Sequence, residues 1–94
     1  MLMKYLLRYS MAQPADMAKL RSHLEDHKRR WDVYARKGSL LAIGPMENPM
    51  DGALGVFTNK ADAEEFAQGD PFVLNGLIGK WDVAGWNEAL IAEQ

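Results

Sequence analysis

The chain has 94 residues, of which 48% are hydrophobic and 26% are charged. These fractions are typical of a globular protein, and the length suits one folding unit, so we expect residues 1–94 to form a single domain. The formal net charge of −2 excludes the basic surface that binding to nucleic acid requires. The sequence contains no cysteine, which excludes disulfides, cysteine nucleophiles and thiolate-bound metals.

The N-terminal segment does not have the features of a targeting or membrane sequence. Residues 1–8 include two charges, Lys4 and Arg8, and lack the long apolar stretch of a signal peptide or a membrane span. We therefore expect a cytoplasmic protein that has no membrane partner.

The first predicted elements are a strand and a long helix. Residues 3–9 alternate between two faces, as in a half-buried strand. Residues 16–37 show helical periodicity and follow a loop that contains Pro14. Asp16 at the beginning of this segment and Gly38 directly after it are typical helix boundaries.

One face of this helix carries an apolar stripe that includes a histidine. A histidine among core-facing residues loses hydration, and its ring then needs a hydrogen-bond partner. His27 is therefore either a structural histidine bonded to a backbone carbonyl or a group that takes part in chemistry, and the residues alone leave both interpretations open. His23 lies one turn earlier, at the margin of the stripe. The members of the stripe, spaced three and four apart, are Met17, Leu20, Leu24, His27, Trp31 and Tyr34.

The second half of the chain predicts three strands, one helix and a helical turn. The strands are expected at residues 39–43, 53–58 and 77–86, the helix at 60–68 and the turn at 72–75, and residues 87–94 form a helical or frayed tail. The order of elements is that of the α+β ferredoxin-like fold, in which both helices cover one face of a four-stranded antiparallel sheet.

The other face of that sheet would carry Leu6, Ile78 and Trp86. This face is too apolar to be left in contact with water, and a second copy of the chain would cover it. We therefore expect a homodimer.

Several kinds of site are not supported by the sequence. His23 and His27 are four residues apart, but the first acidic residue comes one position late for the zinc metalloprotease motif, so we predict no metal. The glycines do not form a phosphate-binding loop before a helix, so we predict no cofactor. No serine has the surroundings of a catalytic nucleophile.

An ordered set of short motifs resembles the YciI-like (YCII-related) family. The set consists of His27, Gly38, the pair Gly44-Pro45 and the triplet Asp70-Pro71-Phe72, and the resemblance extends from residue 3 to residue 86. It implies a dimeric ferredoxin-like fold akin to muconolactone isomerase, with His27 and Asp70 paired in a pocket beside the sheet. It also implies a link to the dehydrochlorination of chlorinated hydroxyaromatic compounds, which one branch of the family performs.

Asp70 also has a purely structural interpretation, as the N-cap of the turn at residues 72–75. The two roles are compatible, because one carboxylate oxygen can cap the turn while the other accepts a hydrogen bond from an imidazole. An aspartate fixes the tautomer of its histidine and raises the basicity of the free ring nitrogen, which suits a general base. With the resemblance, His27 and Asp70 are the candidate catalytic residues. The candidate substrate-binding residues are Trp31, Pro45, Phe72 and His23.

Two functions follow from this reasoning. The first is a small enzyme without a cofactor, in which His27 and Asp70 transfer protons on a small cyclic carbonyl or phenolic compound. The reaction would be an isomerisation or an elimination, such as a dehydrochlorination. The second is a non-catalytic module that binds a small ligand in the same pocket, for example in a stress response. A histidine open to solvent favours the enzyme, whereas a ring sealed by core side chains favours the module.

Overall fold

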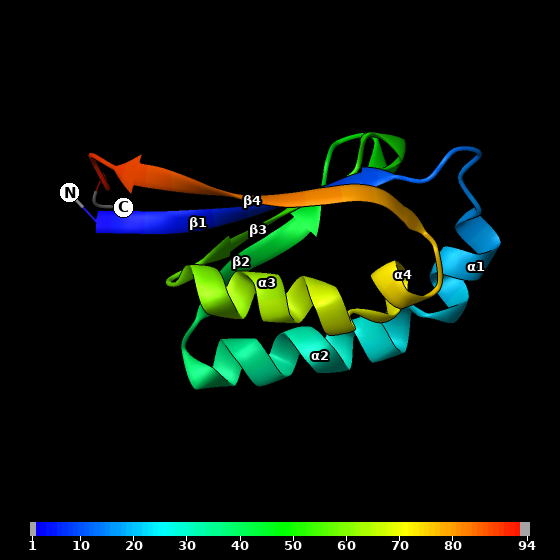
Figure 1. The fold of residues 1–94 in the computed structure, drawn as a ribbon, viewed down its shortest axis with the longest axis horizontal. Helices are drawn as coiled ribbons and strands as arrows, with labels where there is room; N and C mark the ends of the chain where they lie inside the picture. The colour runs from blue at the N-terminus through cyan, green and yellow to red at the C-terminus, as the bar shows by residue number, and fades with distance from the viewer. Residues whose placement is uncertain (1, 93–94) are drawn as a thin grey trace.

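The computed structural model describes residues 2–92, which form a four-stranded antiparallel sheet with helices on one face (Figure 1). The strand order β2-β3-β1-β4 places the first and third strands in the centre, as in the ferredoxin-like fold, so the predicted fold class is confirmed. The elements are β1 (Leu2–Met11), α1 (Met17–Ser22), α2 (Leu24–Lys37), β2 (Leu40–Pro45), the 3-10 helix η1 (Pro49–Asp51), β3 (Ala53–Phe57), α3 (Lys60–Gly69), α4 (Pro71–Leu74) and β4 (Ile78–Glu88).

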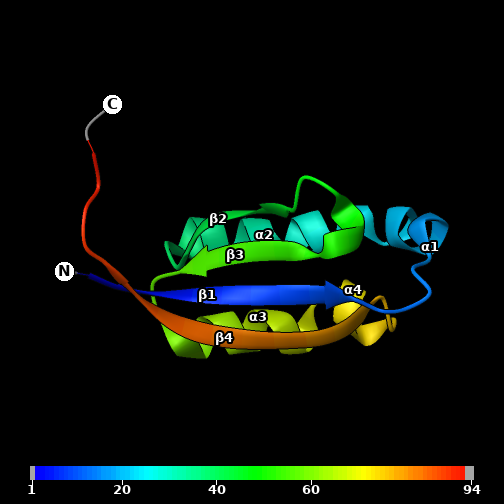
Figure 2. The same cartoon turned by 90° about the horizontal axis from the view of Figure 1, so that it is seen from above.

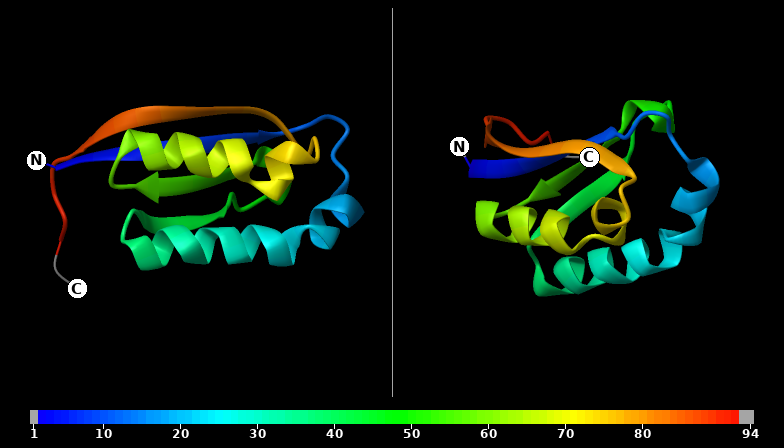
Figure 3. Two further views of the ribbon diagram at one scale, coloured as in Figure 1. Left: turned by 60° about the horizontal axis from the view of Figure 1, so that its bottom comes forward. Right: turned by 45° about the vertical axis from the view of Figure 1, so that its right-hand side comes forward.

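The core lies between the sheet and helices α2 and α3, which run side by side (Figure 3). Alternate residues of β1 and β3 point into it, as the two-residue period of a strand requires. Viewed from above, α1, α4 and the segment containing η1 gather at one end of the sheet (Figure 2). The most deeply buried members of the core are Leu7, Phe57, Ala63, Phe66 and Ala67.

The prediction of one continuous helix over residues 16–37 is wrong, because the chain forms two helices there. His23 ends α1 and begins α2 with φ −106° and ψ 4°, so α1 turns away from the line of α2 (Figure 3). Ser22 Oγ donates to the carbonyl of Lys19 at 2.6 Å, a local bond that competes with helix continuation. The break still leaves the apolar stripe facing the sheet.

The last strand also departs from its predicted alternation. Its partner register shifts between Ser10 and Met11, so that Met11 pairs with Ile78 while Ser10 pairs with Lys80. This bulge turns Ile78 toward the helices, where it packs against the core. The expectation that Ile78 lies on the open face is therefore wrong. The predicted tail contributes Asn87 and Glu88 to β4; residues 89–92 have no regular secondary structure, and residues 93–94 lie outside the described residues.

The open face of the sheet combines apolar side chains with two cross-strand ion pairs. Lys4 Nζ lies 2.7 Å from Glu88 Oε1, and Arg8 Nε lies 2.7 Å from Asp82 Oδ1. Leu6 is half-buried on this face, and Trp86, opposite Lys4 in the pairing with β4, is 45% exposed. Within residues 2–92, no helix is long and apolar enough to cross a membrane.

Gly52 closes the loop between β2 and β3 against β1, and we expect its replacement by alanine to destabilise the fold. Gly52 has a φ of 107°, and an added Cβ would lie 1.9 Å from the backbone oxygen of Tyr9. Gly52→Ala should lower the free energy of unfolding by about 3 kcal/mol, because the backbone strain and the collision add. Urea denaturation measures this loss.

Gly38→Ala is the matched control. Gly38 also has a positive φ, 89°, but the described residues leave open space around its Cβ position. This variant should lose only the strain, about 1–2 kcal/mol. Equal losses in the two variants would contradict the close approach of Gly52 to Tyr9.

Candidate active site

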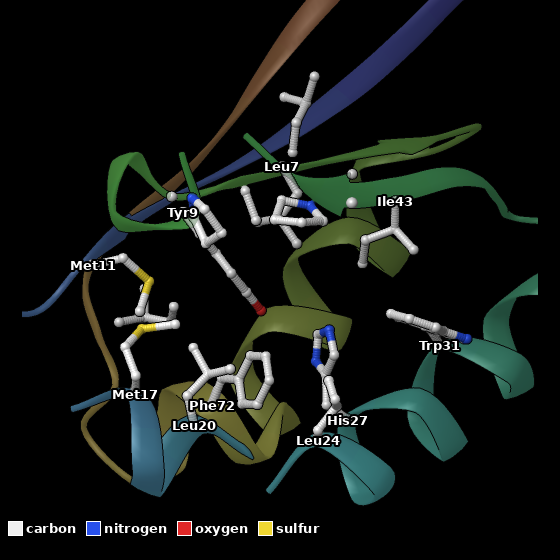
Figure 4. A pocket seen from close by; sticks show the side chains of 18 residues that line it. Leu7, Tyr9, Met11, Met17, Leu20, Leu24, His27, Trp31, Ile43 and Phe72 are labelled. Carbon is white, nitrogen blue, oxygen red and sulfur yellow. The ribbon is translucent and has the colours of Figure 1, made fainter. Parts of the chain in front are cut away.

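A cavity of about 260 Å³ lies between the sheet, α2 and the elements gathered at the end of the sheet. Its lining is almost entirely apolar (Figure 4). Among the described residues that line it, only Tyr9, His27 and Trp31 have a side-chain N or O atom. The lining residues are Leu7, Tyr9, Met11, Met17, Leu20, Leu24, His27, Trp31, Ile43, Gly44, Pro45, Pro49, Gly52, Ala53, Leu54, Gly55, Phe72 and Ile78.

The structure brings most of the predicted site residues to this cavity. Trp31, Pro45 and Phe72 line it together with His27. His23 lies half-buried at the junction of α1 and α2 and is not among the residues that line the cavity. The helix break explains this, because a continuous helix would have carried His23 closer to the stripe.

Asp70 lies behind His27 and is fully buried, at 0% exposure. Its Oδ1 lies 2.8 Å from His27 Nδ1 and accepts a hydrogen bond from the backbone N–H of Phe72 at 3.2 Å. Its Oδ2 accepts a hydrogen bond from the hydroxyl of Tyr9 at 2.6 Å. One oxygen thus serves both the N-cap and the imidazole, whereas we expected one oxygen for each. Three donors thus satisfy the hydrogen-bond needs of this carboxylate in spite of its burial.

The contact with Asp70 determines which nitrogen of His27 carries the proton. A carboxylate accepts hydrogen bonds, so Nδ1 is the protonated nitrogen and Nε2 of the neutral ring keeps its lone pair. Among residues 2–92, every fully buried side-chain N or O atom has a hydrogen-bond partner, but Nε2 has none. Nε2 is therefore not fully buried. It is accessible from the cavity, where it can accept a proton.

Aromatic side chains hold the imidazole in this orientation. Phe72 stacks on it with 4.0 Å between ring centroids and an interplanar angle of 13°. Trp31 and Phe66 meet it edge-on, at centroid distances of 5.2 and 6.0 Å. The ring is thus fixed on both sides, and such preorganisation favours proton transfer at one position.

Tyr9 is the site residue that the sequence analysis missed. Tyr9 lies on the face of β1 that packs against the helices, and a buried tyrosine hydroxyl needs a hydrogen-bond partner, which was the available signal. Figure 4 shows its hydroxyl directed toward the region of His27. Burial and the neighbouring Asp70 carboxylate raise the pKa of Tyr9 well above its usual value, so the phenol remains a neutral donor.

We expect two of the three tyrosines to resist ionisation in the folded protein. Burial and a hydrogen bond to Glu65 raise the pKa of Tyr34 to about 12, and Tyr9 is shifted in the same direction. Because the folded state holds these protons longer than the unfolded state, stability is complete below pH 10 and falls as the pH rises above it. Absorbance titration of the tyrosines and urea denaturation from pH 9 to pH 12 measure both effects.

Tyr9→Phe and Tyr34→Phe should each make the loss of stability above pH 10 less steep. Ionisation of Tyr9 and Tyr34 at ordinary tyrosine pH values, with the fold intact, would contradict their buried partners.

The described part of the chain contains no group of three histidine or acidic side chains with the spacing of metal ligands. Its two acid–base residues at the cavity, His27 and Tyr9, both contact the single carboxylate of Asp70. Tyr9, Asp70 and His27 therefore form one connected hydrogen-bond network beside the cavity.

The fold and the site together define a ferredoxin-like α+β protein with an apolar cavity and a buried aspartate–histidine contact. The YCII-related domain matches residues 3–87, and the chain belongs to this family. Among solved structures, it is similar to the 5-chloro-2-hydroxyhydroquinone dehydrochlorinase of Burkholderia phenoliruptrix in complex with 2,5-dihydroxybenzoquinone. That similarity has a TM-score of 0.63 at 15% identity and covers 92% of this chain and 95% of the other. A comparison with curated proteins gives no significant match.

Proposed function

We propose that the protein is a small-molecule enzyme in which His27 acts as general base and general acid. The observation that carries the proposal is the state of its ring: Nδ1 is bonded to the buried Asp70, and Nε2 is accessible from an apolar cavity. Asp70 stabilises the imidazolium that forms when Nε2 takes a proton, and Tyr9 keeps the carboxylate in place.

The reaction that suits one such base is an isomerisation or an elimination on a phenolic or cyclic carbonyl compound. In a dehydrochlorination, Nε2 takes the proton of a ring hydroxyl and returns it to the carbon that bears chlorine, which gives the keto tautomer. Loss of a second hydroxyl proton then expels chloride, and the ring becomes a quinone. The balance is the loss of one HCl, so no oxidant or reductant is needed.

The solved relative supports the choice of a first substrate to test. It is described as a dehydrochlorinase and is bound to a dihydroxybenzoquinone, and it has the same fold over nearly the whole chain. At 15% identity the likeness does not carry the reaction to this chain, so the proposal depends on the geometry around His27.

The proposal is tested by incubating the protein with 5-chloro-2-hydroxyhydroquinone and following chloride release and quinone absorbance. We expect chloride release above the rate without protein. Heat-unfolded protein is the control for any chloride release that does not depend on the folded site.

The alternative, a non-catalytic binding module, is favoured by the small number of polar atoms in the cavity. It predicts that the phenol binds, as measured by quenching of the tryptophan fluorescence to which Trp31 contributes, and that it is released unchanged. Binding without chloride release, and without exchange of ring protons in deuterated water, would therefore contradict the proposal of an enzyme and support the binding module.

We also propose that two copies of the chain associate through the open face of the sheet. Leu54 and Trp86 are 37% and 45% exposed on this face, and Leu6 and Val56 lie between them. Sedimentation at micromolar concentration should give a dimer, and Val56→Lys should give a monomer. A monomeric wild-type protein would remove this proposal and leave the proposal for His27 unaffected.

A further inference from the structure

The charges around the cavity restrict what can bind in it. Within the described chain, no lysine, arginine, aspartate or glutamate side chain lines the cavity. The Asp70 carboxylate lies directly behind the imidazole, with its Oδ1 2.8 Å from His27 Nδ1. A ligand in the cavity therefore meets one negative charge at short range and no lysine or arginine that could balance a charge of its own.

The two positive features close to the cavity are already occupied. The N-terminus of α4 directs the N–H of Phe72 at Asp70 Oδ1, and a helix of four residues adds little field beyond it. The guanidinium of Arg30 donates to the backbone oxygens of Glu65 and Phe66 at 2.8 and 3.0 Å, at the end of α3. Arg30 thus binds backbone carbonyls in the C-terminal half of α3 and does not line the cavity.

On the basis of the function proposed above, we propose that this site selects its substrate by charge: it accepts a single uncharged ring that carries a weakly acidic hydroxyl, and it rejects carboxylates. The size follows from the volume, because about 260 Å³ is below the roughly 300–1,000 Å³ of pockets for drug-sized ligands. The hydroxyl follows from Nε2, which needs a donor. Figure 4 shows the indole nitrogen of Trp31 on the side of the ring turned away from His27, so Nε2 is the side-chain atom that can anchor the ring.

The rejection of carboxylates follows from counting protons. A neutral phenol brings its own proton to Nε2, and the pair His27–Asp70 does not change its charge when the phenol binds. A carboxylate has no proton to bring, so it can be held only after His27 takes one from water. Where His27 is neutral, each pH unit should then weaken carboxylate binding tenfold.

The charged and titratable groups that affect the proton balance of His27 come from β1, from α2 and from the junction of α3 and α4. Tyr9 faces Asp70 from β1 and stays neutral, His27 and Arg30 belong to α2, and Asp70 lies between α3 and α4. The lining side chains of α1 are the apolar Met17 and Leu20. When His27 is neutral, none of these groups supplies a positive charge to the cavity.

The test compares three ligands by calorimetry with the wild-type protein: 3-chlorophenol and two compounds of nearly equal shape, 3-chlorobenzamide and 3-chlorobenzoate. At pH 8 we expect the phenol and the neutral amide to bind within about tenfold of each other, and the benzoate to bind at least about 100-fold more weakly, because its charge is buried without a partner.

Leu20→Lys is the designed reversal. All residues of α1 are exposed or half-buried, so a lysine can be accommodated there, and it adds the missing cation to the lining. The variant should tighten benzoate binding relative to amide binding by at least about tenfold.

The outcomes separate this inference from the proposed function. Benzoate binding to the wild-type protein within tenfold of the amide would overturn the selection by charge and leave proton transfer by His27 unaffected. If none of the three compounds bound, the cavity would not be a site for ring compounds, and the proposed function would fail together with the inference.

Discussion

Asp70→Ala should lower the free energy of unfolding by about 3–5 kcal/mol, as the breaking of buried charged networks does. The carboxylate is fully buried, and its removal leaves the hydroxyl of Tyr9, His27 Nδ1 and the N–H of Phe72 without their acceptor. The variant also loses the N-cap of α4. Urea denaturation at pH 7, followed by circular dichroism, measures the loss.

Asn59→Ala separates the cap from the network. Asn59 caps α3 by accepting from the N–H of Asp62 at 2.8 Å, in the way that Asp70 caps α4. This control should lose only about 1 kcal/mol, the usual effect of removing an N-cap. A loss for Asp70→Ala no larger than that for Asn59→Ala would show that Asp70 acts as a cap alone.

His27→Ala should lower the rate of chloride release from 5-chloro-2-hydroxyhydroquinone by about 10²- to 10⁴-fold, the range that one general acid–base group contributes. The variant removes Nε2 from the cavity, while Asp70 keeps Tyr9 and Phe72 as donors. The fold should therefore persist, which circular dichroism and the unfolding transition can show.

His23→Ala is the matched control, because it removes the other histidine from the adjacent turn and lies outside the cavity. It should keep the wild-type rate. A His27→Ala protein that is folded and still releases chloride at the rate of the His23→Ala protein would refute the catalytic role of His27.

Most of the fold was predictable because the four strands and α3 carry their own local signals. Residues 60–68 have Asn59 as a capping residue, and the structure places α3 at Lys60–Gly69. The strand limits differ from the predicted ones by one or two residues, as expected for ends that depend on pairing. The two larger misses, at His23 and Ile78, both arise where a local bond or a change of register interrupts a regular period. Periodicity alone does not reveal such interruptions.

The site was predictable only in part. The position of His27 in an apolar stripe identified the histidine, and the family resemblance supplied Asp70. Tyr9 was missed because its role depends on a contact 61 positions along the chain, which no local pattern encodes. The cavity itself depends on α1 and η1 closing one end of the sheet, and the break at His23 that directs α1 there was not predicted.

The central claim is that Asp70 holds the proton of His27 on Nδ1 and leaves Nε2 as the free base in the cavity. Nitrogen-15 NMR of the histidine rings, at a pH where His27 is neutral, measures this directly. The account predicts a protonated Nδ1 and an unprotonated Nε2 for His27, and loss of that fixed tautomer in Asp70→Ala. A His27 ring protonated on Nε2, or one that exchanges between tautomers in the wild-type protein, would contradict it.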